Sequence, residues 1–387
     1  MKFAVIGAGM QGSACAHDLV RSDGVTEILV IDEVDERARA VALAVESVGR
    51  PRVHVRSRRL DVESSRAVAD AVTGCDVVIS AAPYFLNPGI AWAALKAGAS
   101  MVDMGGNTEI VRQELALDEE ARRAGVTIIP DCGLAPGLAN VLVAHGVASL
   151  DEVDTVQVRV GGLPQRPRPP LNYKLVFSPY GLIDEYVGQA TILRDGRRAQ
   201  VPALSEPEAI TFPQPPGECE AFHTAGGSST LPWTFEGKVR HLDYKTVRYP
   251  GHLEQIRLVR DLGFFDETAL PVLGKPVKPR DFTAALFARR LDLPDEPDLV
   301  VLRVAVTGTK AGKPARRQYE LIDYPDKTGG ITAMMRTNAY PTSVIAQMIA
   351  RKLTLGPGAL PVEKAVPPRP FLDELERRGI RVTQERS

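Results

Sequence analysis

Short apolar runs rich in Val, Ile and Leu alternate with longer amphipathic stretches over the first 130 residues of the chain. The apolar runs are FAVIG, EILVID, DVVISAA, SMVDMGG and VTIIPD, with the weaker VHVRSRRLD as the third in order. The amphipathic stretches between them include residues 35–48, 64–72, 88–97 and 109–124. This alternation is typical of βαβ units, which build a parallel sheet with helices on both faces. We therefore predict an α/β fold with a doubly wound parallel sheet in residues 1–131.

The pattern changes after residue 131. Period-2 runs such as TVQVRVGG, VVLRVAV and RQYELIDY alternate there with loops rich in Pro and Gly. The segments 164–170 and 213–217 are incompatible with helix, because proline lacks the amide donor and clashes with the preceding turn. We predict a second, α+β domain with a mixed or antiparallel sheet in residues 132–335. Residues 336–387 read as helical again, and we expect this segment to return to the first domain.

The charge of the chain is nearly balanced, with 47 Lys and Arg against 48 Asp and Glu and a net charge of −1. No global field therefore gathers nucleic acid or an anionic membrane. No apolar run approaches the about 20 residues of a membrane span, and the first residues lack the apolar core of a signal peptide. The 4 cysteines lie far apart and have no metal-ligand spacing. We expect a cytoplasmic protein without metal, membrane or nucleic-acid partners.

A glycine motif follows the first predicted strand and opens the first predicted helix. In the sequence GAGMQG, Gly7 permits a tight turn, Gly9 lets backbone amides approach a pyrophosphate, and Gly12 lets the helix pack on the strand. The second strand ends in Asp32, twenty residues after Gly12, where a carboxylate accepts hydrogen bonds from an adenosine ribose. This context predicts a Rossmann-type dinucleotide site whose residues include Gly7, Gly9, Met10, Gln11, Gly12, Asp32 and Glu33.

The identity of the cofactor depends on the charge around Asp32. A carboxylate repels a 2′-phosphate, so NAD is favoured over NADP. Three arginines (Arg37, Arg39 and Arg56) keep NADP as the alternative, since an arginine near the ribose accommodates the phosphate.

Two further groups lie at predicted strand ends. Asp61 either reaches the adenine or caps the helix that follows. The small residues Ala81, Ala82 and Pro83 lie where the nicotinamide half of the cofactor is expected to pass, because ligands bind outside the carboxyl ends of parallel strands.

Five segments, in this order, carry a family resemblance: GAGMQG, IIPDCGLAPGLAN, VGGLPQRPRPPLNYKLVFSPYGLIDEY, EAFHTAGGSSTL and LDYKTVRYPGH. Together they resemble the saccharopine dehydrogenase-like family, and most closely its NAD-dependent lysine 6-dehydrogenase branch. The resemblance implies a Rossmann domain, a central α+β domain with the amino-acid site and dimer contacts, and a C-terminal segment that folds back. One departure concerns Asn107, which stands where similar sequences tend to carry a histidine. Any catalytic histidine must therefore come from elsewhere.

The resemblance also implies a reaction. It is the NAD-dependent oxidative deamination of the ε-amino group of L-lysine to 2-aminoadipate 6-semialdehyde, which cyclises to 1-piperideine-6-carboxylate as ammonia and NADH are released. Hydride leaves carbon only if the attached amine is neutral, whereas free lysine titrates near 10.4. The site must therefore supply a base, for which His223, Lys245 and Tyr84 are the candidates. His223 suits the later proton transfers from water, but it can equally satisfy backbone groups of its own loop.

An amino-acid substrate needs partners for its charged ends. Arg248 suits the α-carboxylate because a guanidinium grips both oxygens, although a surface arginine is the alternative. Asp103 suits the α-ammonium because it ends a strand, and Asp131 either replaces it or caps a helix. Alternation along DYKTVRY separates Lys245 from Arg248, so both cannot point into one site if the strand is regular. Lys174 and Thr224 complete the predicted substrate-binding set.

Two other functions remain open from the sequence. A saccharopine-type substrate needs additional cations, which Arg166, Arg168 and Lys174 can supply. A non-catalytic NAD-binding sensor needs no substrate site at all. For every function we expect a homo-oligomer, either a dimer or a tetramer.

Overall fold

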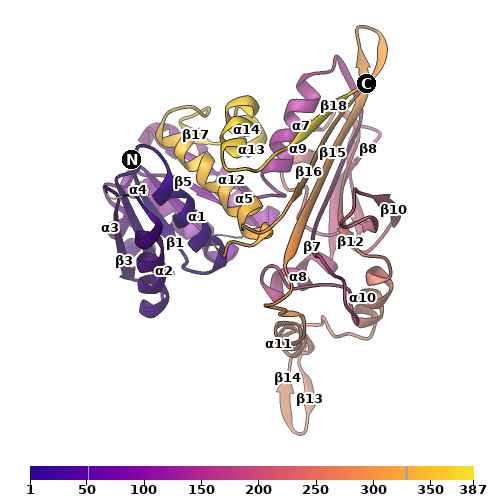
Figure 1. Cartoon of the computed structure of the whole chain (residues 1–387), viewed down its shortest axis with the longest axis horizontal. Coiled ribbons are helices and arrows are strands. Elements are labelled where there is room, and N and C mark those ends of the chain that lie inside the picture. The colour runs from indigo at the N-terminus through magenta and orange to yellow at the C-terminus, as the bar shows by residue number, and fades with distance from the viewer. Residues whose placement is uncertain (51, 327–329) are drawn as a thin grey trace. The chain divides into compact units, whose positions relative to one another are not determined.

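The computed structural model describes residues 1–50, 52–326 and 330–387 (Figure 1). The chain divides into two compact units. The first comprises Met1–His145 and Met335–Arg381, and the second comprises Gly146–Met334 and Val382–Ser387.

The first unit contains a seven-stranded sheet in the order β17-β6-β5-β4-β1-β2-β3, in which every strand pair is parallel. The order runs outward in both directions from β1, so this sheet has a switch point between β1 and β4. The predicted doubly wound sheet is confirmed. Its strands are β1 (Lys2–Ile6), β2 (Glu27–Asp32), β3 (His54–Arg59), β4 (Val77–Ser80), β5 (Ser100–Asp103), β6 (Thr127–Ile129) and β17 (Gly358–Ala359).

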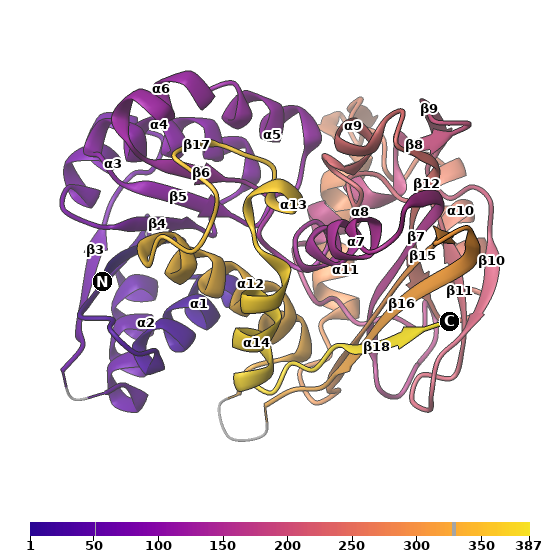
Figure 2. The ribbon, with the colours of Figure 1, turned by 90° about the horizontal axis from the view of Figure 1, so that it is seen from above.

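Helices cover both faces of this sheet, with α1 and α2 on one face and α3, α4 and α6 on the other (Figure 2). Buried Val, Ile, Leu and Ala side chains from strands and helices fill the space between the layers. The helices are α1 (Met10–Arg21), α2 (Asp35–Val48), α3 (Ser65–Val72), the short 3-10 turn η1 (Tyr84–Leu86), α4 (Asn87–Ala97), α5 (Thr108–Leu115) and α6 (Asp118–Ala124). A further helix, α7 (Leu138–Ala148), begins in this unit and ends in the second, which starts at Gly146.

The C-terminal segment adds three helices and β17 to the first unit, namely α12 (Ala333–Ala350), α13 (Val362–Ala365) and α14 (Pro368–Arg377). Helix α12 lies on α1, where the Cys15 thiol donates to the carbonyl of Ala339 and His17 bonds to the Tyr340 hydroxyl at 3.1 Å. Residues 132–145 also belong here, beyond the expected boundary at 131, because Leu134 N–H donates to Asn338 at 2.9 Å.

The second unit contains a nine-stranded mixed sheet, as predicted. Its main path is β10-β11-β12-β7-β15-β16-β18, and β8 pairs with β12 and β9. The β12–β7 pair is parallel and the others are antiparallel. The strands are β7 (Glu152–Pro164), β8 (Gln189–Arg194), β9 (Arg197–Pro202), β10 (Glu208–Thr211), β11 (Glu218–Phe222), β12 (Val239–Arg248), β15 (Asp298–Lys310), β16 (Lys313–Asp323) and β18 (Thr383–Arg386).

The last strand corrects one expectation. The sequence placed all of 336–387 with the first domain, whereas β18 pairs with β16 in the second unit. Every residue of β18 is exposed, so no hydrophobic periodicity announced this strand.

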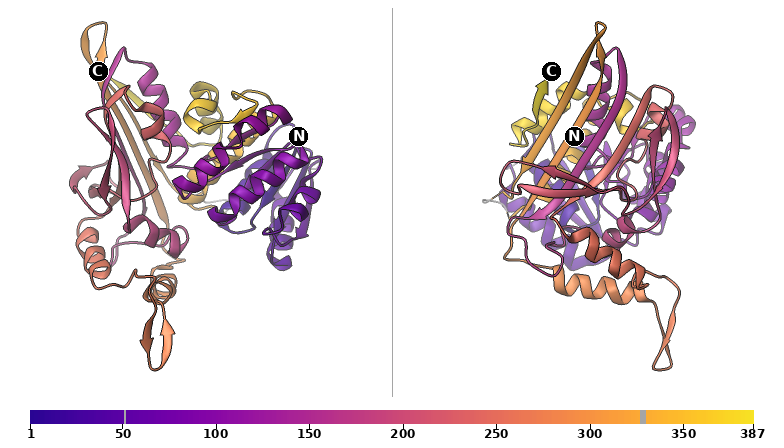
Figure 3. Two further views of the ribbon diagram at one scale, coloured as in Figure 1. Left: turned by 180° about the vertical axis from the view of Figure 1, so that it is seen from behind. Right: turned by 90° about the vertical axis from the view of Figure 1, so that its right-hand side faces the viewer.

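Four helices and a hairpin complete the second unit. The helices are α8 (Pro179–Tyr186), α9 (Leu231–Phe235), α10 (His252–Asp261) and α11 (Pro279–Leu291). The hairpin of β13 (Leu270–Val272) and β14 (Lys275–Val277) forms a separate two-stranded sheet that extends away from α11 (Figures 1 and 3). Over residues 1–50, 52–326 and 330–387, no helix is both long and apolar enough to cross a membrane.

Candidate functional site

The glycine loop after β1 has the geometry that its motif requires. Gly7 has a φ of +97°, and a Cβ there would lie 2.6 Å from the carbonyl oxygen of Ala81. A Cβ on Gly12 would lie 1.7 Å from the Gly7 oxygen, whereas a Cβ on Gly9 would meet nothing within 4 Å. Gly7 and Gly12 therefore serve the close packing of strand and helix. Gly9 leaves open the space that a pyrophosphate needs.

The N-terminus of α1 is open to an anion. Gly9 is the N-cap, no side chain caps the helix, and its first turn contains no acidic residue. The next two residues are also suitably placed, since Met10 is 52% exposed and the buried Gln11 Oε1 has no hydrogen-bond partner among the residues described. Free amide groups at a helix N-terminus bind phosphate, so the loop fits a dinucleotide.

Asp32 is held rigidly at the end of β2. Its Oδ2 accepts a hydrogen bond from Ala8 N–H at 2.8 Å, and its Oδ1 accepts one from Val34 N–H at 2.9 Å. The side chain of Arg37 approaches Oδ1 at 3.8 Å but is 56% exposed. Glu33, next along the chain, is exposed. The carboxylate of Asp32 is thus fixed beside the glycine loop, where an adenosine ribose is expected.

Asp61 lies in the turn before α3 and is exposed. Its Oδ1 accepts a hydrogen bond from Glu63 N–H at 3.0 Å. The cap of α3 is instead Ser64, whose hydroxyl accepts from Ala67 N–H. The capping alternative for Asp61 is therefore wrong, and its adenine contact stays a prediction.

The carboxyl ends of the strands bring most of the predicted first-unit residues to one edge of the sheet. The order β6-β5-β4-β1-β2-β3 places there, in turn, Asp131, Asp103, the segment 81–84, the glycine loop, Asp32 and Asp61. A dinucleotide lying along this edge has its adenosine at β2 and its nicotinamide toward β4 and β5.

Tyr84 follows the small residues Ala81, Ala82 and Pro83 after β4. Ala81 N–H donates to the Ile6 carbonyl at 2.7 Å, which fixes the start of this segment beside the glycine loop. The half-buried Tyr84 packs on Gly106, where a Cβ would lie 3.1 Å from its side chain. Of the predicted catalytic residues, Tyr84 and Asp103 lie at this edge of the first unit, after β4 and at the end of β5.

The two predicted carboxylates of the first unit are buried. Asp103 has no exposed surface, and its Oδ1 accepts from Gly105 N–H at 2.6 Å and from Asp131 N–H at 3.2 Å. Asp131 is 1% exposed. Asp103 therefore joins two loops of the first unit, rather than presenting its carboxylate at a surface for an ammonium group.

Glu114 was missed by the sequence reasoning, although it lies against Asp103. It belongs to α5 and has no exposed surface. Its spacing of three residues from the buried Val111 was a usable signal, because residues three apart share a helix face.

Arg248 lies inside the second unit. It is 2% exposed, and its Nη2 donates to Glu185 at 3.0 Å while its Nε donates to the Tyr186 hydroxyl at 3.1 Å. The guanidinium also lies 4.7 Å from the ring centre of Tyr173. Burial and the Arg248 charge lower the pKa of the neighbouring His252 to about 3, so this imidazole is neutral. Arg248 thus has a protein carboxylate as its partner, and a substrate would have to compete for it.

His223 and Thr224 follow β11 and are both buried. The ring nitrogens of His223 bond to the Tyr244 carbonyl at 3.1 Å and to Glu206 at 3.3 Å. The Thr224 hydroxyl bonds to the Thr246 hydroxyl at 2.6 Å. Both nitrogens of His223 are therefore engaged, but the partners lie on β12 and before β10, so the structure does not show the histidine satisfying its own loop at 226–230.

Lys245 belongs to a group of paired charges on the opposite face of β12 from Arg248. Its Nζ donates to Glu208 at 2.9 Å, and Glu208 also pairs with Arg159. Arg159 donates in turn to Asp243 at 2.8 Å. The predicted separation of Lys245 from Arg248 is confirmed, so the two do not serve one site in the second unit.

Lys174 ties two loops of the second unit together. Its Nζ donates to the carbonyl oxygens of Leu293 at 2.7 Å and Glu296 at 2.5 Å. The Glu296 carboxylate is 1% exposed and pairs with Arg166 at 3.1 Å and Arg168 at 3.4 Å. All three cations that a larger acidic substrate would need are therefore engaged with the protein.

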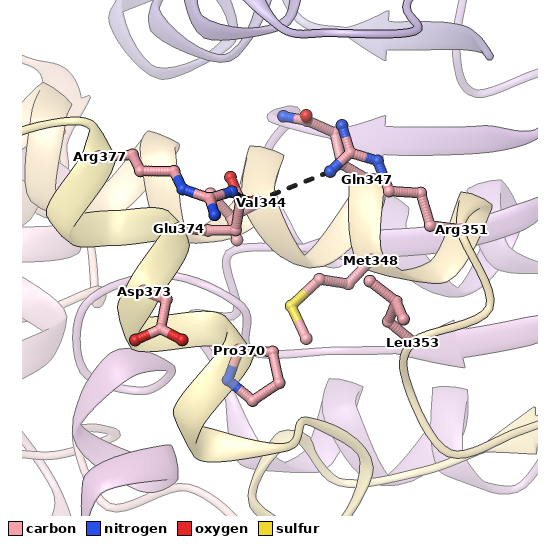
Figure 4. A pocket seen from close by; sticks show the side chains of 9 residues that line it. All are labelled: Val344, Gln347, Met348, Arg351, Leu353, Pro370, Asp373, Glu374 and Arg377. Atoms are coloured by element: carbon pink, nitrogen blue, oxygen red, sulfur yellow. Dashed lines mark hydrogen bonds and ion pairs between the residues drawn. The ribbon is translucent and has the colours of Figure 1, made fainter.

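A small pocket of about 140 Å³ lies between α12 and α14 (Figure 4). Arg351, Glu374 and Arg377 contribute its charged lining together with Asp373. Glu374 accepts from Arg377 at 2.6 Å and lies 3.8 Å from Arg351. None of the predicted site residues lines this pocket.

Comparisons with known proteins cover nearly the whole chain. Residues 3–129 match the saccharopine dehydrogenase NADP binding domain, and residues 133–380 match the saccharopine dehydrogenase C-terminal domain. The apo saccharopine dehydrogenase (L-Glu forming) of Saccharomyces cerevisiae shares the fold, with a TM-score of 0.80 at 20% identity over 100% of this chain and 99% of that one.

Three curated relatives span different shares of their own lengths. The NADP(+)-dependent, L-glutamate-forming saccharopine dehydrogenase of Schizosaccharomyces pombe is 23% identical over 84% of this chain and 87% of that protein. The carboxynorspermidine synthase of Vibrio cholerae is 23% identical over 98% and 96%. The mitochondrial alpha-aminoadipic semialdehyde synthase of Bos taurus is 26% identical over 72% of this chain but 30% of its own length. With both domain models matched in order, the chain belongs to the saccharopine dehydrogenase family.

Proposed function

We propose that the protein is an NAD-dependent amino-acid dehydrogenase that oxidatively deaminates the ε-amino group of L-lysine. The products are 2-aminoadipate 6-semialdehyde, which cyclises to 1-piperideine-6-carboxylate, together with ammonia and NADH. The motif resemblance to lysine 6-dehydrogenases supports this substrate. One structural observation carries the choice over saccharopine, namely that Arg166, Arg168 and Lys174 are already bound to Glu296 and to backbone carbonyls.

The choice of NAD rests on Asp32. Its carboxylate is fixed by two backbone amides, so it cannot turn away from a 2′-phosphate without losing both hydrogen bonds. The matching domain model is described as NADP binding, and the exposed Arg37 offers a nearby cation that such a cofactor would use. We propose that the fixed carboxylate outweighs the exposed guanidinium.

NAD, when bound, accepts the hydride from the carbon that bears the amine. Tyr84 is the residue that we propose as the base: once its phenol has given its own proton to water, the phenolate oxygen accepts the ammonium proton. We choose Tyr84 because it follows the small residues after β4. A phenol titrates near 10 and a lysine ammonium near 10.4, so proton exchange between them is close to balanced. The glycine loop and Asp32 hold the two ends of the cofactor's adenosine diphosphate half.

The main alternative is a substrate with a secondary amine, in which the nitrogen carries a second carbon group. The names of the relatives favour it, because two of the three reported above are a saccharopine dehydrogenase and a carboxynorspermidine synthase. In this alternative Arg166 and Arg168, which are 66% and 58% exposed, exchange Glu296 for a substrate carboxylate.

The test is to incubate the protein with L-lysine or saccharopine and either NAD or NADP, and to follow the absorbance of the reduced cofactor. Ammonia release from lysine supports the proposal, whereas release of a second amino acid from saccharopine supports the alternative. Tight NAD binding without oxidation of any amine would support a cofactor-binding sensor. Tyr84→Phe is the matched variant, expected to retain NADH binding but to lose most of kcat.

A further inference from the structure

Glu114 and Asp103 form a buried pair of carboxyl groups in the first unit. Neither residue has exposed surface, and among the described residues Asp103 Oδ2 and both side-chain oxygens of Glu114 are buried without a hydrogen-bond partner. A hydrogen bond between two carboxyl groups requires a proton, because two carboxylates have only acceptors. If these oxygens satisfy one another, the pair carries one proton and one negative charge.

The environment decides which residue holds the proton. Asp103 Oδ1 accepts two backbone N–H groups, from Gly105 and Asp131, and these stabilise its negative charge. The oxygens of Glu114 accept no N–H or O–H from any other residue in the described ranges. Burial raises the pKa of Glu114 far above its ordinary 4.5, and the charge of Asp103 raises it further. Glu114 is consequently the protonated partner.

In the described part of the chain, no cation is among the groups that act on Asp103 or Glu114. The other titratable groups that act on the pair are Asp131 and the Cys132 thiol, both buried. Asp131, a third buried carboxyl group, raises the pKa of Glu114 further. Because no cation among the residues that the structure describes lies there to neutralise a second buried negative charge, Glu114 stays neutral by keeping its proton.

The pair connects the loops at the nicotinamide end of the sheet. Asp103 holds the Gly105 amide of its own loop and the Asp131 amide of the next loop. Gly106, one residue further, packs against Tyr84. A displacement of Asp103 would therefore be transmitted to the loop on which Tyr84 rests.

We propose that Glu114 is a positioning residue, whose protonated carboxyl donates a hydrogen bond to Asp103 and thereby fixes the loops after β5 and β6 around the nicotinamide end of the cofactor site. For catalysis this inference rests on the proposed function, because it acts through the loop that supports Tyr84. The prediction that Glu114 keeps its proton in the folded protein does not depend on which substrate the protein uses.

Glu114→Gln tests the pair directly, because an amide donates to Asp103 at every pH. Glu114→Leu fills a similar volume without a donor and leaves Asp103 buried beside an apolar group. The matched control is Glu109→Gln, which removes a carboxylate from the same helix at an exposed position paired with Arg112. We expect E114Q to bind NADH within about twofold of the wild type, and E114L about tenfold more weakly.

Thermal unfolding at several pH values reports the proton itself. The unfolded chain loses the Glu114 proton near pH 4.5 and the folded protein keeps it, so wild-type stability falls as pH rises above that value. The amide of E114Q does not titrate, so the stability of this variant does not fall with pH for this reason. The Tm of E114Q minus that of the wild type should therefore rise by several degrees from pH 5 to pH 8, while the same difference for E109Q stays flat.

The outcomes separate the inference from the proposed function. A pH-independent or falling Tm difference for E114Q overturns the inference, because Glu114 is then ionised in the folded protein. Equal NADH binding and equal kcat/KM in E114Q and E114L overturn the positioning role. A rising Tm difference with no turnover of lysine supports the pair and rejects lysine as the substrate.

Discussion

Asp32 offers a direct test of cofactor choice, through its replacement by Ser. The carboxylate of Asp32 is 6% exposed and is oriented by Ala8 N–H and Val34 N–H. A 2′-phosphate would have to lie within about 5 Å of it, since both occupy the ribose end of β2. Serine removes the charge and retains a hydroxyl for the ribose.

The size of the effect follows from Coulomb's law. Two unit charges about 5 Å apart near a protein surface repel each other by about 3 kcal/mol at an effective dielectric constant of about 20. Arg37, 3.8 Å from the carboxylate but 56% exposed, offsets part of this repulsion. We expect about 2 kcal/mol to remain, which corresponds to NADH binding about 30-fold more tightly than NADPH.

Fluorescence titration of the wild type and D32S with both reduced cofactors measures the effect. The ratio of the two Kd values is the quantity to compare, because a general weakening of the loop cancels in it. We expect D32S to bring the ratio within about threefold of one. Asp35→Asn is the control, since Asp35 lies on α2 and pairs with Arg39. Tighter NADPH binding by the wild type, or an unchanged ratio in D32S, would refute the reasoning.

Three further predictions concern the second unit. Arg248→Met leaves the carboxylate of Glu185 without its guanidinium partner, so it should lower the free energy of unfolding by about 2 to 3 kcal/mol in urea titrations. The double variant R248M/E185Q should recover part of this loss. An unchanged urea midpoint in R248M would contradict the prediction. Burial opposes ionisation of Glu208, but Arg159 and Lys245 hold its pKa below the ordinary 4.5, so the stability it contributes is present above that pH and is lost as pH falls through the lower value. Glu208→Gln should accordingly flatten the decline of Tm between pH 6 and pH 3, and a parallel decline would show that the pairs contribute nothing. The β13–β14 hairpin exposes the apolar side chains of Leu270, Val272 and Leu273, the last of them 99% exposed. Because a two-stranded hairpin is only marginally stable by itself, we expect this one to pack on a second copy of the chain. Leu273→Arg should then convert a dimer into a monomer in sedimentation velocity without changing NADH binding, whereas a monomeric wild type would refute the contact.

Much of the first unit was predictable, because its signals are local. The alternation of apolar runs and amphipathic stretches predicted the parallel sheet, and the glycine spacing predicted which residues pack without a Cβ. Asp32 was predictable for the same reason, since the end of β2 and the glycine loop belong to one βαβ unit. The exposed strand β18 was not predictable, because its four residues have no apolar face.

The charged residues show most clearly the difference between what the sequence determines and what only the tertiary structure determines. The sequence by itself determined the Rossmann-type unit, the open glycine loop and the alternation that sets Lys245 and Arg248 on opposite faces of β12. Only the tertiary structure decided which charges are engaged, because Arg248 meets Glu185, Lys245 meets Glu208, and Asp103 meets Glu114 through the packing of separate elements. Periodicity places a side chain on a face, but the partner that satisfies a buried charge is set by which distant segment packs there.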